Sequence, residues 1–267
     1  MYKDSISQYL HTHQYHKIHL KAVLFDMDGV LFDSMPYHAE AWHKVMCERN
    51  MPLSREEAYL YEGRTGASTI NIVCQREQNR TATQEEIEAI YNEKTIAFNS
   101  FPEAQPMPGA QDILNKVKRS GLTPILVTGS GQSSLLDRLD NSFPDTFKQE
   151  LMVTAFDVKH GKPNPEPYLM ALSRGNLQPF EAIVVENAPL GVEAAVAAGI
   201  FTIAVNTGPL DDSVLLNAGA NLLFPSMKAL SEAWEALAQE FSSTTTPLSQ
   251  SGLQPLTDKI SKQSKKV

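Results

Sequence analysis

The chain has 267 residues, 42% of them hydrophobic, so it can bury one large core or a core with a smaller companion domain. Its formal net charge of −8 argues against a nucleic-acid-binding protein, and a site for an anionic ligand must carry local cations. The sequence has no apolar run of about eighteen residues, as a membrane helix requires, and no segment typical of a signal peptide. Two cysteines, Cys47 and Cys74, do not make a disulfide framework, so we expect a cytoplasmic protein that binds neither membrane nor nucleic acid.

Residues 1–19 form a polar leader with four histidines. These histidines lack the spacing and the rigid scaffold of a metal site, so we expect a partly ordered extension. At the other end, residues 242–267 are rich in Ser, Thr, Pro and Lys and predict a disordered tail.

Apolar runs of strand length recur along the chain, at 22–26, 123–128, 151–156, 182–186, 201–205 and 221–224. From the second run onward, helical patterns separate them, at 110–119, 132–139, 165–174 and 190–198. This alternation predicts an α/β fold, a Rossmann-like, doubly wound parallel sheet with helices on both faces.

Residues 35–105 depart from this rhythm and read as several amphipathic helices. One helical face carries His38, Trp42 and Val45, and a later helix continues the pattern through Lys94. We therefore predict a helical cap inserted into a catalytic core of residues 20–34 and 106–241. The proline-rich stretch FPEAQPMPG marks the return to the core as a hinge.

Asp26-Met27-Asp28-Gly29 follows the first apolar run, where a buried strand meets solvent. Alone, such a motif is usually a polar turn, since Asp and Gly are common turn formers. Because Gly29 lets the chain turn, the carboxylates of Asp26 and Asp28 can also converge on one point, as a metal-assisted phosphoryl-transfer site requires.

Other polar residues stand at the ends of later strands, where open parallel sheets bind their ligands. Thr128, Gly129 and Ser130 make a small-residue loop that can hold phosphate oxygens. Glu186-Asn187 ends another strand, and Lys162 lies in a loop stiffened by three prolines.

The sequences FDMDGVLFDS, LVTGS, GKPNPEPY and VVENAPLGVEAA together resemble the haloacid dehalogenase superfamily. Within it, the chain is similar to the β-phosphoglucomutase-like group with a helical cap, over about residues 20–235. The resemblance implies that Asp26 is a nucleophile forming an aspartyl-phosphate and that Asp28 is the general acid and base. It also implies that Thr128, with the backbone of Gly129 and Ser130, binds the transferring phosphoryl group.

The resemblance further implies that Lys162 neutralises charge between the nucleophile and the phosphate. It implies Mg²⁺ as the cofactor, held by the Asp26 carboxylate, the Asp28 backbone carbonyl and Asn187, with Glu186 orienting bound waters. The cap then excludes bulk water.

Two departures bear on the substrate. Asn187 stands where the family usually has Asp, which removes a negative charge from the metal shell. In the cap loop 61–68, Glu62 and Gly66 align with the lysine and arginine that grip the distal phosphate in sugar-phosphate mutases. We hypothesise that Glu62 replaces the lost carboxylate and completes the Mg²⁺ shell when the cap closes; a solvent-facing glutamate is the alternative.

Arg64 is a candidate anion contact, and His38 with Ser34 is a candidate for shaping the seam between cap and core, although a packed His38 without such a role is the alternative. The sequence thus predicts a Mg²⁺-dependent phosphohydrolase for inorganic diphosphate or a small phosphorylated metabolite. A β-phosphoglucomutase is the first alternative, and a non-catalytic sugar-phosphate-binding protein the second. No obligate protein partner is inferred.

Overall fold

The computed structural model describes residues 2–130 and 133–246. Its centre is a five-stranded parallel sheet in the order β2-β1-β3-β4-β5. The strands are β1 (Ala22–Phe25), β2 (Thr123–Leu126), β3 (Ala182–Glu186), β4 (Phe201–Val205) and β5 (Leu222–Phe224). The predicted Rossmann-like α/β fold is confirmed. In this strand order, ligands bind near the switch point beside β1.

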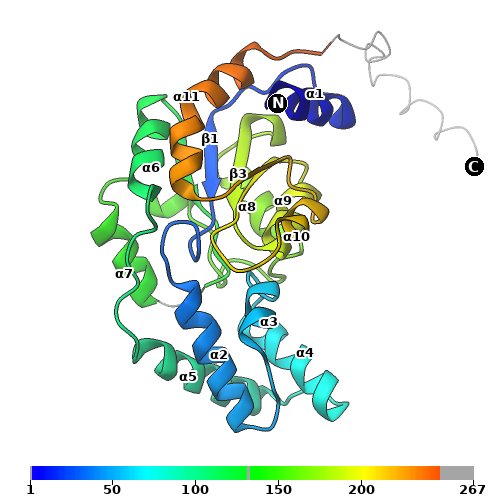
Figure 1. The fold of residues 1–267 in the computed structure, drawn as a ribbon, viewed down its shortest axis with the longest axis vertical. Coiled ribbons are helices and arrows are strands. Elements are labelled where there is room, and N and C mark those ends of the chain that lie inside the picture. Colours follow the sequence, from blue (N-terminus) through cyan, green and yellow to red (C-terminus); the bar gives the residue numbers. More distant parts are fainter. Residues whose placement is uncertain (1, 131–132, 247–267) are drawn as a thin grey trace, which may run out of the picture.

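Different helices cover the two faces of the sheet (Figure 1). Side chains along β1 point alternately to one face and to the other. Val23 and Phe25 join the core that contains α6 (Ala110–Arg119) and α11 (Met227–Ser243). Ala22 and Leu24 join the opposite core, which contains α8 (Glu166–Arg174) and α9 (Pro189–Ala197). The remaining core elements are α7 (Ser133–Ser142), α10 (Asp212–Asn217) and the short helices η1 (Gln149–Leu151) and η2 (Pro179–Glu181).

The strand predicted at 151–156 is wrong. Val153 makes only an isolated bridge to Val127, and the chain then turns. The cause is Asp157, whose carboxylate accepts from both the backbone N–H and the hydroxyl of Thr154 at 2.8 Å. A side chain that satisfies the local backbone in this way favours a turn over a strand.

The leader differs from the partly ordered extension we expected. It forms helix α1 (Tyr2–His13), with Ile6, Tyr9 and Leu10 buried. These apolar residues recur at helical spacing between the polar ones and pack beside α11, and the Tyr9 hydroxyl donates to the Gly199 carbonyl at 2.8 Å. The leader therefore contains an amphipathic helix whose apolar face packs on the core, and the histidines follow these apolar residues in the sequence.

The boundary predicted for the disordered tail, residue 242, is too early in the chain. Ser242 and Ser243 complete α11, and Thr245 bridges to Lys17. Residues 247–267 lie outside the described part of the chain.

The predicted cap region contains four helices, α2 (Met35–Glu48), α3 (Arg55–Leu60), α4 (Gly66–Gln78) and α5 (Gln84–Asn99), which lie together at one end of the core (Figure 1). Capping boxes at Ser54–Glu57 and Thr83–Glu86 fix the starts of α3 and α5. Within the described ranges, no helix is both long and apolar enough to span a bilayer.

The two chain segments that join the cap to the core run side by side. Asp33 N–H donates to the Gln105 carbonyl at 2.9 Å, and Met107 N–H donates to the Leu31 carbonyl at 2.8 Å. Phe32 and Pro106 form an antiparallel bridge between them. The predicted hinge is therefore hydrogen-bonded to the other segment that joins the cap to the core.

Candidate active site

Two aspartates at the end of β1 line one cavity. Asp26 N–H extends the parallel ladder by donating to the Val185 carbonyl at 3.1 Å. Gly29 then turns the chain with φ +77°, and a Cβ there would lie 2.1 Å from the Asn187 amide nitrogen. Only glycine permits both this turn and the close approach of Asn187. Asp26 and Asp28 consequently converge, as the motif predicts.

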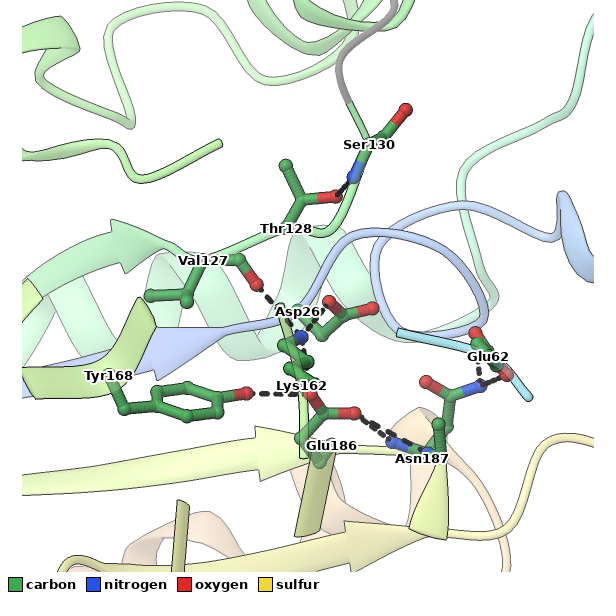
Figure 2. A network of polar contacts seen from close by, with 10 residues as sticks. Asp26, Glu62, Val127, Thr128, Ser130, Lys162, Tyr168, Glu186 and Asn187 are labelled. Carbon is green, nitrogen blue, oxygen red and sulfur yellow. Dashed lines mark hydrogen bonds and ion pairs between the residues drawn. The ribbon is translucent and has the colours of Figure 1, made fainter. Parts of the chain in front are cut away.

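Lys162 lies at the centre of a buried ion network (Figure 2). Its Nζ donates to Asp26 Oδ1 at 2.5 Å, to Glu186 Oε1 at 2.6 Å and to the Val127 carbonyl at 3.1 Å. Burial alone would lower the pKa of Lys162, but the two carboxylates outweigh it and hold the pKa above its ordinary value. Burial raises the pKa of Asp26 to about 8, against the opposing effect of Lys162. A lasting positive charge therefore lies against the predicted nucleophile.

Glu186 is fully buried, and both of its carboxylate oxygens have protein donors. Oε1 accepts from Lys162 and from the Tyr168 hydroxyl, each at 2.6 Å. Oε2 accepts from the backbone N–H groups of Asn187 at 3.1 Å and Ala188 at 3.4 Å. In this arrangement Glu186 anchors Lys162; its role toward metal-bound water stays a prediction. The sequence analysis did not single out Tyr168, although it ends the motif GKPNPEPY.

The loop after β2 presents Thr128, Gly129 and Ser130 to the same cavity. Thr128 is buried, and its Oγ1 accepts from Ser130 N–H at 3.0 Å, so its own proton is available to a ligand (Figure 2). A Cβ on Gly129 would lie 2.9 Å from the Gly63 carbonyl oxygen of the cap loop. The small residue thus lets the cap loop rest directly on the predicted phosphate loop.

Asp28 is held by His38 of the predicted cap and by Ser34, which directly precedes the cap. Its Oδ1 accepts from the Ser34 hydroxyl at 2.5 Å and lies 3.2 Å from His38 Nε2. On the far side of the ring, Lys94 Nζ lies 2.7 Å from His38 Nδ1. Because an ammonium can only donate, Nδ1 accepts and Nε2 carries the proton that points to Asp28. Among the described residues, both contacts are to Oδ1, which leaves Asp28 Oδ2 to carry the proton that the predicted acid–base role requires.

Burial and then the nearby Lys94 ammonium lower the pKa of His38, which favours the same neutral ring. Burial alone would raise the pKa of Asp28, but the contacts with His38 and Ser34 and the charge of Lys94 outweigh it and lower that pKa. His38, a candidate for shaping the cap–core seam, therefore lies against the predicted acid and stacks on Phe98 with ring centroids 4.1 Å apart.

Lys94 is a functional candidate that the sequence analysis missed. It is 3% exposed, and its Nζ lies within 5.0 to 6.0 Å of the ring centroids of Trp42, Tyr91 and Phe98. Burial lowers the pKa of Lys94 to about 8. The sequence contains a signal for this residue. Ile87, Ile90, Tyr91 and Lys94 share one helical face, and a lysine on an otherwise apolar face is unusual.

Glu62 reaches from the cap loop to the end of β3. Both of its carboxylate oxygens lie 3.1 Å from the Asn187 amide nitrogen (Figure 2). Burial, and then the charge of Asp26, raise the pKa of Glu62 well above its ordinary value. The solvent-facing alternative for Glu62 is therefore wrong, although whether it binds a metal stays a prediction.

The donor set suits a hard divalent cation that prefers oxygen ligands. Asn187 Oδ1 is buried without a hydrogen-bond partner, beside the carboxylates of Asp26 and Glu62. Within the described residues, no three His, Cys, Asp or Glu side chains form a metal-binding group by themselves. The proposed shell therefore depends on the Asn187 amide and the Asp28 backbone carbonyl.

The cavity that Asp26 and Asp28 line is small, about 80 Å³. Cap residues Tyr61, Glu62, Gly63 and Arg64 close it against the phosphate loop. Pockets for drug-sized ligands measure about 300–1,000 Å³, so this closed arrangement favours a compact substrate. Arg64 is half-buried at the rim, with its guanidinium carbon 5.9 Å from the centre of the Tyr61 ring.

The chain belongs to the haloacid dehalogenase-like hydrolase family, which it matches over residues 23–205. A phosphorylated carbohydrates phosphatase of Thermotoga maritima is 31% identical over 219 residues, covering 82% of this chain and 100% of the relative. The β-phosphoglucomutase of Bacillus subtilis is 23% identical over 224 residues, covering 81% of this chain and 96% of the relative.

Among solved structures, one from Bacteroides vulgatus with a provisional β-phosphoglucomutase name is 65% identical. It superposes with a TM-score of 0.88 and covers 90% of this chain and 98% of its own. The β-phosphoglucomutase-like group inferred from the motifs is confirmed. The similar proteins include both phosphatases and phosphomutases of small phosphorylated compounds.

Proposed function

We propose that the protein is a Mg²⁺-dependent phosphohydrolase that forms an aspartyl-phosphate at Asp26 and acts on inorganic diphosphate or another small phosphorylated compound. The observation that carries the proposal is the contact of Asn187 with Glu62, a residue that lines the cavity of about 80 Å³. A carboxylate at this position repels the distal phosphate of a sugar bisphosphate unless a cation lies between them.

In the first step, an Asp26 carboxylate oxygen attacks phosphorus, and the bond from phosphorus to the leaving oxygen breaks. Asp28 gives its proton to that oxygen. In the second step, Asp28 takes a proton from the attacking water as the water oxygen bonds to phosphorus and Asp26 leaves. Lys162 stays against Asp26 and balances the negative charge through both steps.

The remaining residues position these groups. The Thr128 hydroxyl donates a hydrogen bond to a phosphoryl oxygen, and the backbone of Gly129 and Ser130 completes the phosphate-binding loop. His38 holds one Asp28 oxygen while Lys94 fixes the ring tautomer. When bound by Asp26, Asp28, Asn187 and Glu62, Mg²⁺ supplies further neutralisation of the phosphoryl charge.

A phosphorylated carbohydrate is the second candidate substrate, favoured by the carbohydrate phosphatase from Thermotoga maritima. A β-phosphoglucomutase is the corresponding isomerase, and its activity requires other cap groups to replace the distal-phosphate clamp lost at Glu62 and Gly66. The free thiols of Cys47 and Cys74 support a cytoplasmic location.

A substrate panel tests the proposal on the full chain with Mg²⁺. It compares diphosphate, sugar monophosphates, and β-glucose 1-phosphate supplied with the bisphosphate. We expect phosphate release from diphosphate or a small monophosphate, abolished by Asp26→Asn and by EDTA, restored by Mg²⁺, and retained in the surface control Asp112→Asn. Isomerisation without phosphate release contradicts the hydrolase, and turnover that survives Asp26→Asn contradicts the nucleophile.

A further inference from the structure

A second cavity lies outside the catalytic one, where the cap meets the core. Its volume is about 480 Å³. One wall comes from the cap loop and the start of α4, with Arg64, Thr65 and Ser68. The other wall is the core segment 159–164 that precedes α8. One wall belongs to the predicted cap and the other to the predicted core, so both parts of the chain contribute to the cavity.

This cavity is separate from the predicted phosphoryl site. A Cβ on Gly63 would lie 3.0 Å from Lys162 Cδ, so the cap backbone packs on the lysine stem. The Lys162 ammonium points to the other side, toward Asp26. Gly63 and the alkyl stem of Lys162 thus lie between the two cavities, and Arg64 lines both of them.

Its walls carry hydrogen-bond donors and unpaired positive charge. In the described part of the chain, neither Arg64 nor Lys159 has a carboxylate within ion-pair distance. Arg64 Nε is buried and has no hydrogen-bond partner.

The neighbouring carboxylate does not neutralise this pair. Glu166 accepts from the backbone N–H groups of Lys159 and His160 at 2.8 and 3.0 Å and from the His160 ring at 2.8 Å. Asn164 Oδ1 accepts from the Glu166 N–H at 2.9 Å, which leaves the Asn164 side-chain N–H groups to donate. The Thr65 oxygen accepts from the Ser68 N–H at 3.2 Å, so its proton remains available.

We propose that this seam cavity binds a second anion of the phosphate class, held by Arg64 from the cap and Lys159 from the core. Arg and Lys beside hydroxyl and amide donors match a tetrahedral dianion with many acceptor oxygens. The anion bridges two domains, so its binding stabilises the closed cap. Two sources share this chemistry: free inorganic phosphate, and the far phosphate of a longer oligophosphate substrate.

The first arm of the test measures inorganic phosphate binding to the full chain with Mg²⁺ by equilibrium dialysis. If free phosphate is the occupant, we expect two phosphates per wild-type chain. Lys159→Met weakens one site at least about fivefold, as loss of a charge-assisted contact predicts. The matched control Lys148→Met, an exposed lysine elsewhere on the core, keeps both sites.

The second arm compares kcat/KM for diphosphate and tripolyphosphate. If the far phosphate of a substrate is the occupant, Lys159→Met lowers kcat/KM for tripolyphosphate at least about fivefold and leaves that for diphosphate unchanged. In the same samples, phosphate or tripolyphosphate slows amide exchange in residues 61–65 of wild type more than in Lys159→Met.

One phosphate per wild-type chain, together with equal behaviour of Lys159→Met and Lys148→Met in both arms, overturns the proposal. The dialysis arm requires no turnover. The dialysis arm can therefore demonstrate a second phosphate site even if the hydrolase proposal fails. If dialysis finds no second site, the hydrolase proposal is unaffected.

Discussion

Replacing Lys94 by Met is expected to leave the protein at least as stable as wild type at pH 7.5 and to make it less active. Burial lowers the pKa of Lys94 from 10.5 to about 8, so the folded state holds this proton more weakly than the unfolded state. At about 1.4 kcal/mol per pKa unit, the buried ammonium destabilises the fold by about 3 kcal/mol below pH 8. This destabilisation is relieved as the pH rises from 8 to 10.5.

The assay is urea unfolding at several pH values between 7.5 and 10.5. At pH 7.5, the variant loses the hydrogen bond to His38, worth about 1–3 kcal/mol, but also loses the buried charge, so its unfolding free energy equals or exceeds that of wild type. Between pH 7.5 and 10.5, wild type should gain about 3 kcal/mol relative to the variant. The exposed control Lys44→Met should show no such change.

Activity provides the second readout. Among the described residues, Lys94 is the hydrogen-bond partner of His38 Nδ1 and so fixes the tautomer that donates to Asp28. Without Lys94, kcat should therefore fall at least about tenfold while the protein stays folded. A wild-type-minus-variant stability difference that is constant across this pH range refutes the buried-ammonium argument. Unchanged kcat refutes the positioning role.

Three further changes test the rest of the structure. Glu62→Gln should raise the Mg²⁺ concentration for half-maximal activity at least about tenfold, as loss of one charged ligand predicts; a magnesium dependence equal to that of the surface control Glu56→Gln contradicts a ligand role. Tyr168→Phe should lower the free energy of unfolding by about 1–2 kcal/mol and lower kcat, because Glu186 loses a donor; unchanged values in both measurements oppose the anchoring role. Leu10→Ala should cost about 2–5 kcal/mol of stability without changing activity per folded molecule, and a cost near zero shows that α1 does not dock.

Residues at strand ends could be predicted from sequence because parallel strands bring their carboxyl ends to one edge. Asp26, Thr128 and Glu186 each follow a buried apolar run, and the register of β1 with β2 and β3 places them together. The turn at Gly29 was likewise visible in the sequence, since its conformation depends on a local residue type.

Residues outside the strand ends were harder to predict. Lys94, on cap helix α5, and Tyr168, on core helix α8, reach the site only through tertiary packing. The apolar helical face around Lys94 marks this lysine as unusual but does not reveal what it contacts. The strand expected at 151–156 failed because the Asp157 side chain competes for the backbone, and the leader was misread because histidines surround its apolar stripe. The Asp157 contact lies outside the apolar pattern of its segment, whereas the leader contains the apolar pattern that forms α1.

The pairing of β1 has a consequence for how the chain folds. This strand is hydrogen-bonded on one side to residues 123–126 and on the other to residues 182–185. The cap helices, in contrast, pack on one another within residues 35–99. Local contacts form faster than pairings between distant segments, so the cap is expected to fold while the ribosome is still making the sheet. The strand that leads to Asp26 would gain its second neighbour only after β3 has emerged.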